Sequence, residues 1–228
     1  MELTLIDKRH ETLDTVSFFF KPTSPIFWTP GQFLIYTLEH QNPDVRGKMR
    51  FFTISSAPFE NHITITTKID EKTPSSFKKA LNGMPIGGKI QAKGPDGDFI
   101  IENPLEEYVF IAGGTGITPF RSIIADLAHD KSPINVTLLY AYQNEDIVFK
   151  KELDEIANGN PNIKLNYFIS PVHIDVESIG KVVSDPKRPF YFISGPNNFV
   201  EGLSVVVNRL GIEEKRIKHD YFSGYDND

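Results

Sequence analysis

The sequence changes its pattern near residue 104, and this change constrains the fold more than any other feature. Before it, short runs rich in β-branched and aromatic residues are separated by Pro, Gly and Asn. We expect strands at Thr15–Phe20, Phe33–Leu38, Phe51–Ser55, Ile63–Ile69, Lys89–Lys93 and Phe99–Ile101. Strands of this length and spacing are typical of an antiparallel barrel or sandwich. One helix over Ser75–Leu81 interrupts them, because Ser75 or Ser76 can cap its start and Gly83 follows its end.

After Pro104, strand-like and helix-like segments alternate. The expected strands are Tyr108–Ala112, Val136–Tyr142, Ile163–Ile169, Phe190–Ser194 and a last extended piece around Arg216–Phe222. The expected helices are Thr118–Asp130, Phe149–Ala157 and about Phe199–Leu210. Such alternation is typical of βαβ units in a parallel sheet that helices cover on both faces. The sequence therefore predicts two domains, an antiparallel β-barrel over residues 1–103 and an α/β domain with an open parallel sheet over residues 104–228.

Composition excludes several classes of protein. The 228 residues include no Cys, so iron–sulfur ligation, a cysteine zinc site and a thiol nucleophile are excluded within this chain, and the six His residues show no metal-ligand spacing. We expect no metal site. The net charge of −6 argues against a nucleic-acid-binding protein. No apolar run approaches the roughly 20 residues of a membrane helix, and the N-terminus lacks the apolar core of a signal peptide. We therefore expect a cytoplasmic protein with no membrane association.

A glycine-rich loop follows the first strand of the second half. It comprises Gly113, Gly114, Thr115, Gly116, Ile117, Thr118 and Pro119. Thr118 is a good helix N-cap and Pro119 a good first helical residue. Glycines let the backbone approach a ligand, and a helix start suits a pyrophosphate, so a dinucleotide is the natural ligand. The loop does not follow the G-x-G-x-x-G pattern, and a tight turn that binds nothing is the alternative.

A second turn follows a later strand of the same sheet. Ser194, Gly195 and Pro196 come directly after Phe190–Ser194. Ligands bind at the carboxyl ends of strands in open α/β sheets, so this position supports a site there. Taken alone, the Gly-Pro sequence indicates only a turn.

An arginine lies within an apolar strand of the first half. Strand alternation places Arg50, Phe52 and Ile54 on one face. A buried guanidinium needs an anion, and its paired donors suit a phosphate, while an aromatic side chain two residues on can pack against a flat ring. The alternative is an edge-strand arginine paired with a surface carboxylate. The surrounding residues 46–93 carry nine Lys and Arg against three Asp and Glu, and an anionic ligand would account for part of this surplus.

Taken together, the motifs resemble the ferredoxin–NAD(P)⁺ reductase superfamily, in which a flavin-binding barrel precedes a nicotinamide-nucleotide domain. The resemblance runs from about Leu3 to Tyr225. It rests on the order and spacing of PGQF at Pro30–Phe33, RFFTISSAP at Arg50–Pro58, SSFKKAL, GPDGDF at Gly94–Phe99, GGTGITP, SGPNN and DYFSGY at Asp220–Tyr225. It implies FAD as the cofactor and NADH or NADPH as the co-substrate.

The resemblance implies roles for residues of the first domain. Arg50 would neutralise the flavin pyrophosphate, Phe52 would pack on the isoalloxazine, and Thr53 would lie near flavin N5. The helix that begins at Ser75 and Ser76 would donate N–H groups to the same pyrophosphate, which implies FAD more than FMN. The remaining expected cofactor-binding residues are Ile54, Ile65, Thr67 and Lys68.

The resemblance also implies roles in the second domain. The glycine-rich loop would hold the NAD(P)H pyrophosphate, with Thr115 close to the nicotinamide half. Ser194 stands where many relatives have Cys, so we expect it to position the nicotinamide. Tyr142 and Gln143 would lie near the adenosine; they are followed by no Arg that would select a 2′-phosphate, which favours NADH. Tyr225 would cover the flavin and move during turnover, unless it only packs against the core as we expect for Phe222.

The predicted function is that of a flavin-dependent oxidoreductase, in which hydride passes from NAD(P)H to FAD and electrons then pass to a separate acceptor such as ferredoxin or flavodoxin. Surplus lysines would steer an acidic partner, or they form only a solvated face; they are Lys48, Lys72, Lys79, Lys89 and Lys93. Two alternatives are open. One is a diaphorase-like reductase of free flavin, quinone or ferric chelates, and the other is a non-catalytic sensor that binds flavin or nucleotide.

Overall fold

The computed structural model describes residues 1–69 and 75–222. The chain divides into two compact units, Met1–Ile100 and Ile101–Asp228, here called the first and second unit. The division lies three residues before the predicted domain boundary. Within the described ranges, no helix combines the length and apolar character needed to cross a membrane.

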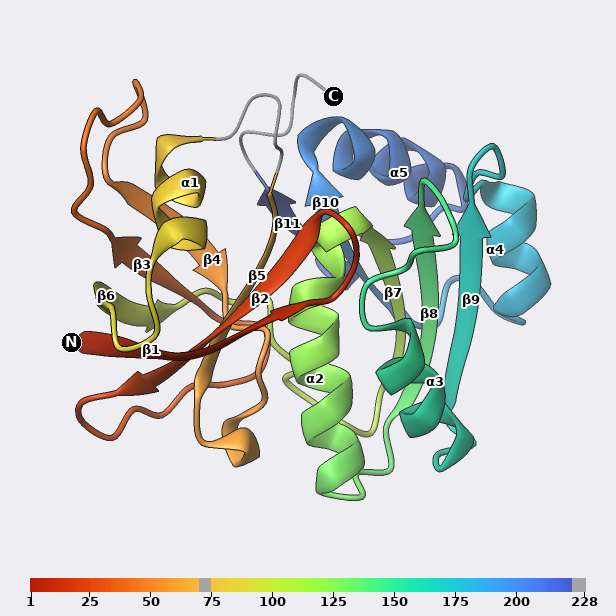
Figure 1. Cartoon of the computed structure of the whole chain (residues 1–228). Helices are drawn as coiled ribbons and strands as arrows, with labels where there is room; N and C mark the ends of the chain where they lie inside the picture. The colour runs from red at the N-terminus through yellow and green to blue at the C-terminus, as the bar shows by residue number, and fades with distance from the viewer. Residues whose placement is uncertain (70–74, 223–228) are drawn as a thin grey trace. The chain divides into compact units, whose positions relative to one another are not determined.

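The first unit is a strongly curled antiparallel sheet of six strands in the order β4-β3-β6-β1-β2-β5 (Figure 1). The strands are β1 (Glu2–His10), β2 (Thr15–Pro22), β3 (Phe33–Thr37), β4 (Met49–Thr53), β5 (Ile63–Lys68) and β6 (Lys89–Asp96). Alternate side chains of these strands, with Phe77 and Leu81 of helix α1 (Ser76–Gly83), form one apolar core. The amphipathic helix is therefore held by the face that it buries.

The barrel prediction is confirmed, with the correction that the sheet is a half-barrel. Its end strands β4 and β5 do not pair as strands. Residues after β4 approach β5 instead: the Ser55 N–H donates to the Thr64 carbonyl at 3.0 Å, and the Thr64 N–H donates to Ser56 Oγ at 3.0 Å. Two local predictions differ from the structure, because the sequence did not single out β1 as a strand and Phe99–Ile101 is not one.

The second unit is a parallel sheet, as the sequence predicts, and its five strands lie in the order β11-β10-β7-β8-β9. The strands are β7 (Glu107–Gly113), β8 (Asn135–Tyr142), β9 (Ile163–Ile169), β10 (Phe190–Pro196) and β11 (Ile217–Phe222). The helices are α2 (Ile117–His129), α3 (Lys150–Asn158), α4 (Val176–Val182) and α5 (Asn197–Arg209).

Helices cover both faces of the parallel sheet, α2 and α3 on one face and α4 and α5 on the other (Figure 1). Alternation along β7 shows this directly. The Phe110 ring stacks on Phe120 of α2 with centroids 4.6 Å apart, whereas Val109 and Ile111 join the core that contains Val200 and Val207 of α5. Because both faces of the sheet are buried at its centre, the inner strands β7, β8 and β10 read as nearly continuous apolar runs.

Strand register brings the predicted ligand loops to one edge of the parallel sheet. Ala112 lies opposite Ser194, Gly113 lies opposite Ala141, and Ser194 lies opposite Asp220. The carboxyl ends of β7, β8, β10 and β11 are therefore aligned, which is where open α/β sheets bind ligands.

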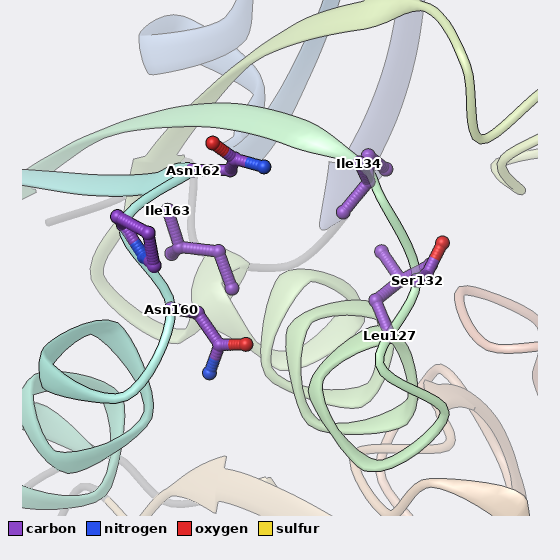
Figure 2. Close-up of a pocket in the computed structure, with 7 residues that line it drawn as sticks. Leu127, Ser132, Ile134, Asn160, Asn162 and Ile163 are labelled. Atoms are coloured by element: carbon purple, nitrogen blue, oxygen red, sulfur yellow. The ribbon is translucent and has the colours of Figure 1, made fainter.

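Figure 2 shows a small pocket at the other edge of this sheet, between the end of α2 and the starts of β8 and β9. Its lining residues are Leu127, Ser132, Ile134, Asn160, Pro161, Asn162 and Ile163. They belong to the end of α2, the start of β9 and the segments before β8 and β9, at the amino-terminal edge of the sheet, so this pocket is not part of the candidate site.

Candidate functional site

Arg50 of β4 lies at the centre of a charged cluster in the first unit. Its guanidinium Nη2 donates to both carboxylate oxygens of Asp44, at 2.8 and 3.0 Å, and its side chain is only 12% exposed. Nη1 donates to the carbonyls of Arg46, Gly47 and Met49 at 2.7–3.0 Å. Among the residues that the structure describes, buried Nε has no partner. Of the two interpretations left open by the sequence, the structure shows the arginine paired with a carboxylate.

The same carboxylate lies at the start of helix α1. The Ser76 N–H donates to Asp44 Oδ2 at 3.0 Å, and the Asp44 N–H donates to Ser76 Oγ at 2.8 Å. Ser75 caps the helix as predicted, since its Oγ accepts from the Lys78 N–H at 3.2 Å. Burial alone would raise the pKa of Asp44, but hydrogen bonds from backbone N–H groups and the Arg50 guanidinium outweigh it and lower the pKa to about 2. Asp44 is therefore an anion at every working pH.

Phe52 shares the Arg50 face of β4, as strand alternation predicts. It is half-buried, and its ring lies 5.9 Å from Tyr36 and 5.7 Å from Phe77 between centroids. The Arg50 guanidinium lies 5.5 Å from the same Phe77 ring. Thr53 is buried at the end of the strand. Phe52 thus keeps a partly exposed surface, which its predicted packing against a flat ring requires.

The other predicted cofactor-binding residues of the first unit differ in exposure. Ile54 and Ile65 lie in the apolar core with no exposed surface, and Thr67 is buried, so these three positions present almost no surface to a ligand in this structure. Lys68 is half-buried, with its Nζ 3.5 Å from Asp14, and its carbonyl accepts from Lys78 Nζ at 3.0 Å. The sequence resemblance does not distinguish buried positions from exposed ones, either after β4 or along β5.

The glycine-rich loop of the second unit forms a short 3₁₀ turn, Gly114–Gly116, which continues directly into α2. The predicted N-cap role of Thr118 is wrong. The residue before the helix is Gly116, whose backbone is already helical, so α2 lacks the extended residue that a side-chain cap requires. Thr118 Oγ1 donates instead to the Thr115 carbonyl at 3.1 Å. Pro119 still lies within the first turn, where its missing N–H costs nothing.

The two loops at this edge pack backbone against backbone. A Cβ on Gly116 would lie 2.2 Å from the Ser194 carbonyl oxygen, and a Cβ on Gly113 or Gly195 would lie within 3 Å of the Phe199 ring. Gly114 differs, because it has a φ of +52° and a Cβ there would meet nothing within 4 Å. The loop is thus closed against the protein at Gly113 and Gly116 and open at Gly114, as a phosphate-binding loop must be.

Two polar contacts hold this edge in place. The Tyr140 hydroxyl, from the buried middle of β8, donates to the Gly114 carbonyl at 3.1 Å. Buried Ser194 Oγ donates to Asp220 Oδ2 of β11 at 3.1 Å. Burial raises the pKa of Asp220 to about 6, although the Ser194 hydrogen bond opposes the rise. Sequence reasoning selected Ser194 and missed Asp220, because only the β10–β11 register brings the two together.

The remaining predicted residues lie at the rim of this edge or outside the described residues. The Tyr142 ring meets Tyr140 edge-on at 5.8 Å between centroids, and Gln143 is exposed beside it. Phe222 is half-buried at the end of β11, and Tyr225 lies outside the described residues. Of the five surplus lysines, Lys72 also lies outside the described residues. Lys48 and Lys89 form ion pairs with Glu39 and Glu2, and Lys79 and Lys93 are exposed.

Known proteins resemble this chain along most of its length. Residues 110–200 match the family described as Oxidoreductase NAD-binding domain. A flavohemoprotein of Rhodopirellula baltica is 26% identical over 94% of this chain and 58% of its own length. A stachydrine N-demethylase reductase subunit of Rhizobium meliloti is 26% identical over 97% of this chain and 66% of its own length. The chain therefore spans less than two thirds of both relatives.

A solved structure has the same fold. It is the flavohem-like FAD/NAD binding domain of nitric oxide dioxygenase from Vibrio cholerae, with a TM-score of 0.85 and 20% identity over 97% of this chain and 98% of that one. Its likeness extends through both units, the curled antiparallel sheet and the parallel sheet. The chain is therefore similar in fold to FAD/NAD binding domains of reductases, and its residues 110–200 match the Oxidoreductase NAD-binding domain family, in agreement with the resemblance that the sequence motifs indicate.

Proposed function

We propose that this chain is a flavin-dependent reductase that takes a hydride from NADH or NADPH onto bound FAD and passes the electrons to a separate acceptor protein. The observation that carries the proposal is the Arg50 cluster, in which a guanidinium and the first N–H of α1 converge on one anion. A site that holds a carboxylate in this way has the donors that a phosphate needs.

The residues of the first unit fit a flavin dinucleotide. Arg50 and Ser76 supply donors for a pyrophosphate, and Arg50 Nε, which has no partner among the described residues, is a further donor. Phe52 supplies an apolar ring for the isoalloxazine, with Thr53 next to it in the strand. FAD, when bound, supplies the chemistry that accepts a hydride and releases electrons. Because riboflavin has no phosphate and FMN has only one, we expect this site to prefer FAD.

The residues of the second unit fit a nicotinamide dinucleotide. The backbone around Gly114 is open to a pyrophosphate, and the Tyr140 hydroxyl fixes the carbonyl of that residue. Above pH 6, Asp220 is ionised and holds the hydroxyl hydrogen of Ser194. Asp220 then orients the Ser194 hydroxyl, and Ser194 positions the nicotinamide without transferring a proton. Hydride transfer between two bound rings requires orientation and exclusion of water more than a general base.

The acceptor is proposed to be another protein, since one relative is named a reductase subunit. Among the four described members of the surplus lysines, the exposed Lys79 and Lys93 would attract an acidic carrier, because Lys48 and Lys89 are already paired with carboxylates. The coenzyme is proposed to be NADH, since the residues after β8 include the exposed Glu145 and Asp146, which would repel a 2′-phosphate.

Titration of the apoprotein with FAD and then with reduced coenzyme tests the proposal. We expect FAD to bind more tightly than FMN, and anaerobic NADH to bleach the visible flavin absorbance faster than NADPH. Arg50→Ala should weaken FAD at least tenfold, because it removes the main phosphate donor. A protein that binds FAD but is bleached by neither coenzyme would be a sensor, and one that binds no FAD would refute the proposal.

A further inference from the structure

The segment between β3 and β4, residues 38–48, places the carboxylate of Asp44 at the site where, on the proposed function, the flavin pyrophosphate binds. Asp44 occupies both Nη2 contacts of Arg50 and the Ser76 N–H of α1 at the same time. These donors belong to strand β4 and helix α1, and a further donor comes from the segment itself, where the Arg46 N–H donates to Asp44 Oδ1 at 2.9 Å. A side chain that accepts hydrogen bonds from all of these donors occupies the position that a bound phosphate group would take.

We propose that Asp44 is an internal competitor of the flavin, so that FAD binds only by exchanging the Asp44 carboxylate for its pyrophosphate. This inference rests on the proposed function. The exchange conserves the partners of Arg50 and α1, since a carboxylate and a phosphate both accept paired hydrogen bonds. The two anions do not share the site, because like charges a few ångströms apart in a half-buried place repel strongly.

Leu38 anchors the start of the segment in the apolar core, whereas the part around Asp44 is held by polar contacts, including those of the Arg46 and Gly47 carbonyls with Arg50, which allows the exchange. Besides Asp44, it is tied to α1 through His40, whose Nε2 lies 3.0 Å from Ser76 Oγ. Val45, next to Asp44, is fully exposed. Gly47 has a φ of +68° and would meet no atom within 4 Å if it carried a Cβ. Displacing Asp44 therefore breaks polar contacts at the surface and opens no apolar core.

The decisive variant is Asp44→Asn, which removes the competing charge and keeps an oxygen that accepts the Ser76 N–H. We expect the apoprotein of this variant to bind FAD about tenfold more tightly, measured by quenching of flavin fluorescence or by calorimetry. Glu39→Gln is the matched control, because it removes one negative charge from the same segment, where Glu39 pairs with Lys48 outside the Arg50 cluster. Its dissociation constant for FAD should stay within about twofold of wild type.

An Asp44→Asn dissociation constant equal to or weaker than that of wild type would overturn the exchange, and a weaker one would mean that Asp44 holds Arg50 ready for the flavin. Hydrogen exchange on the wild-type chain tests the same step without a variant. The Asp44 amide donates to Ser76 Oγ, so FAD should speed its exchange, and unchanged protection would contradict the proposal.

The two proposals fail in different ways. If wild type binds FAD and NADH bleaches it, while Asp44→Asn binds no more tightly, only the exchange is wrong. If neither wild type nor the variant binds FAD, the proposed function and the exchange are both refuted.

Discussion

Replacing Gly116 with Ala tests the close packing that shapes the glycine-rich loop. Gly116 directly precedes helix α2, and its backbone conformation is ordinary for alanine, so the effect of the methyl group is steric. The added Cβ would lie 2.2 Å from the Ser194 carbonyl oxygen and 2.7 Å from the Gly195 Cα. Both are backbone atoms of β10, which is paired with β7 and β11, so neither can move like the end of a flexible side chain.

The distance sets the size of the effect. Ordinary contact for such a Cβ begins at 3.4 Å, so the start of α2 and the end of β10 would have to separate by more than 1 Å. Forcing a methyl group into a packed site costs about 1–3 kcal/mol, and a clash with backbone lies at the upper end. We expect a loss of about 3 kcal/mol in the free energy of unfolding of the second unit. With an m-value of about 2 kcal/mol/M, the urea midpoint would fall by about 1.5 M.

Urea unfolding followed by far-UV circular dichroism reports the second unit, since four of the five α-helices found in residues 1–69 and 75–222 lie there. Fluorescence of Trp28, the only tryptophan, reports the first unit and serves as an internal reference. Gly202→Ala is the matched control, because Gly202 lies inside α5 and a Cβ there meets nothing within 4 Å. It should stabilise by about 0.5–1 kcal/mol. A Gly116→Ala midpoint equal to that of wild type would refute the packing described for the two loops.

Two further predictions concern the same sheet edge. Tyr140→Phe removes the hydrogen bond to the Gly114 carbonyl and should cost about 1 kcal/mol of unfolding free energy, measured by urea titration; no loss would mean that the bond is not formed. Asp220→Asn should stabilise the fold at pH 8 by about 1–2 kcal/mol and hardly at pH 4. The folded pKa of Asp220, about 6, lies above its unfolded value of about 4, so the wild type loses stability as pH rises between them. A pH-independent difference would contradict the raised pKa.

Most of the second unit was predictable because its signals are local. Each buried strand is an apolar run bounded by turn residues, and β9 matches its predicted range of Ile163–Ile169. The helix missed by sequence reasoning, α4, has only seven residues, too few for a clear period. Its start nevertheless carries a capping box, since Asp175 accepts from the Ser178 N–H and Ser178 Oγ accepts from the Asp175 N–H. That Asp-x-x-Ser signal could have located it.

The site was less predictable, because its decisive contacts depend on distant residues or on loop conformation. Asp220 acquires its raised pKa only when β11 lies beside β10, and no local pattern in the sequence encodes that register. Thr118 has the chemistry of an N-cap, but the preceding glycines extend the helical backbone upstream of it. For Arg50, strand alternation shows which face the guanidinium occupies. It does not show which anion the guanidinium meets, since that depends on how residues 38–48 fold back.

The two interpretations of Arg50, a phosphate ligand and an ion-pair partner, describe one set of donors with two anions. A site built for phosphate would leave a guanidinium and a helix start unsatisfied when empty, and leaving them so costs free energy. In the unliganded protein, Asp44 satisfies these donors. FAD must then displace Asp44, so the free energy of FAD binding becomes less favourable by the free energy of the lost Asp44 contacts. The glycine-rich loop of the second unit has no such carboxylate among its described contacts, and a Cβ at Gly114 would meet only open space. On the proposed function, the nicotinamide nucleotide therefore enters a preformed loop, whereas the flavin must first displace a side chain of the protein.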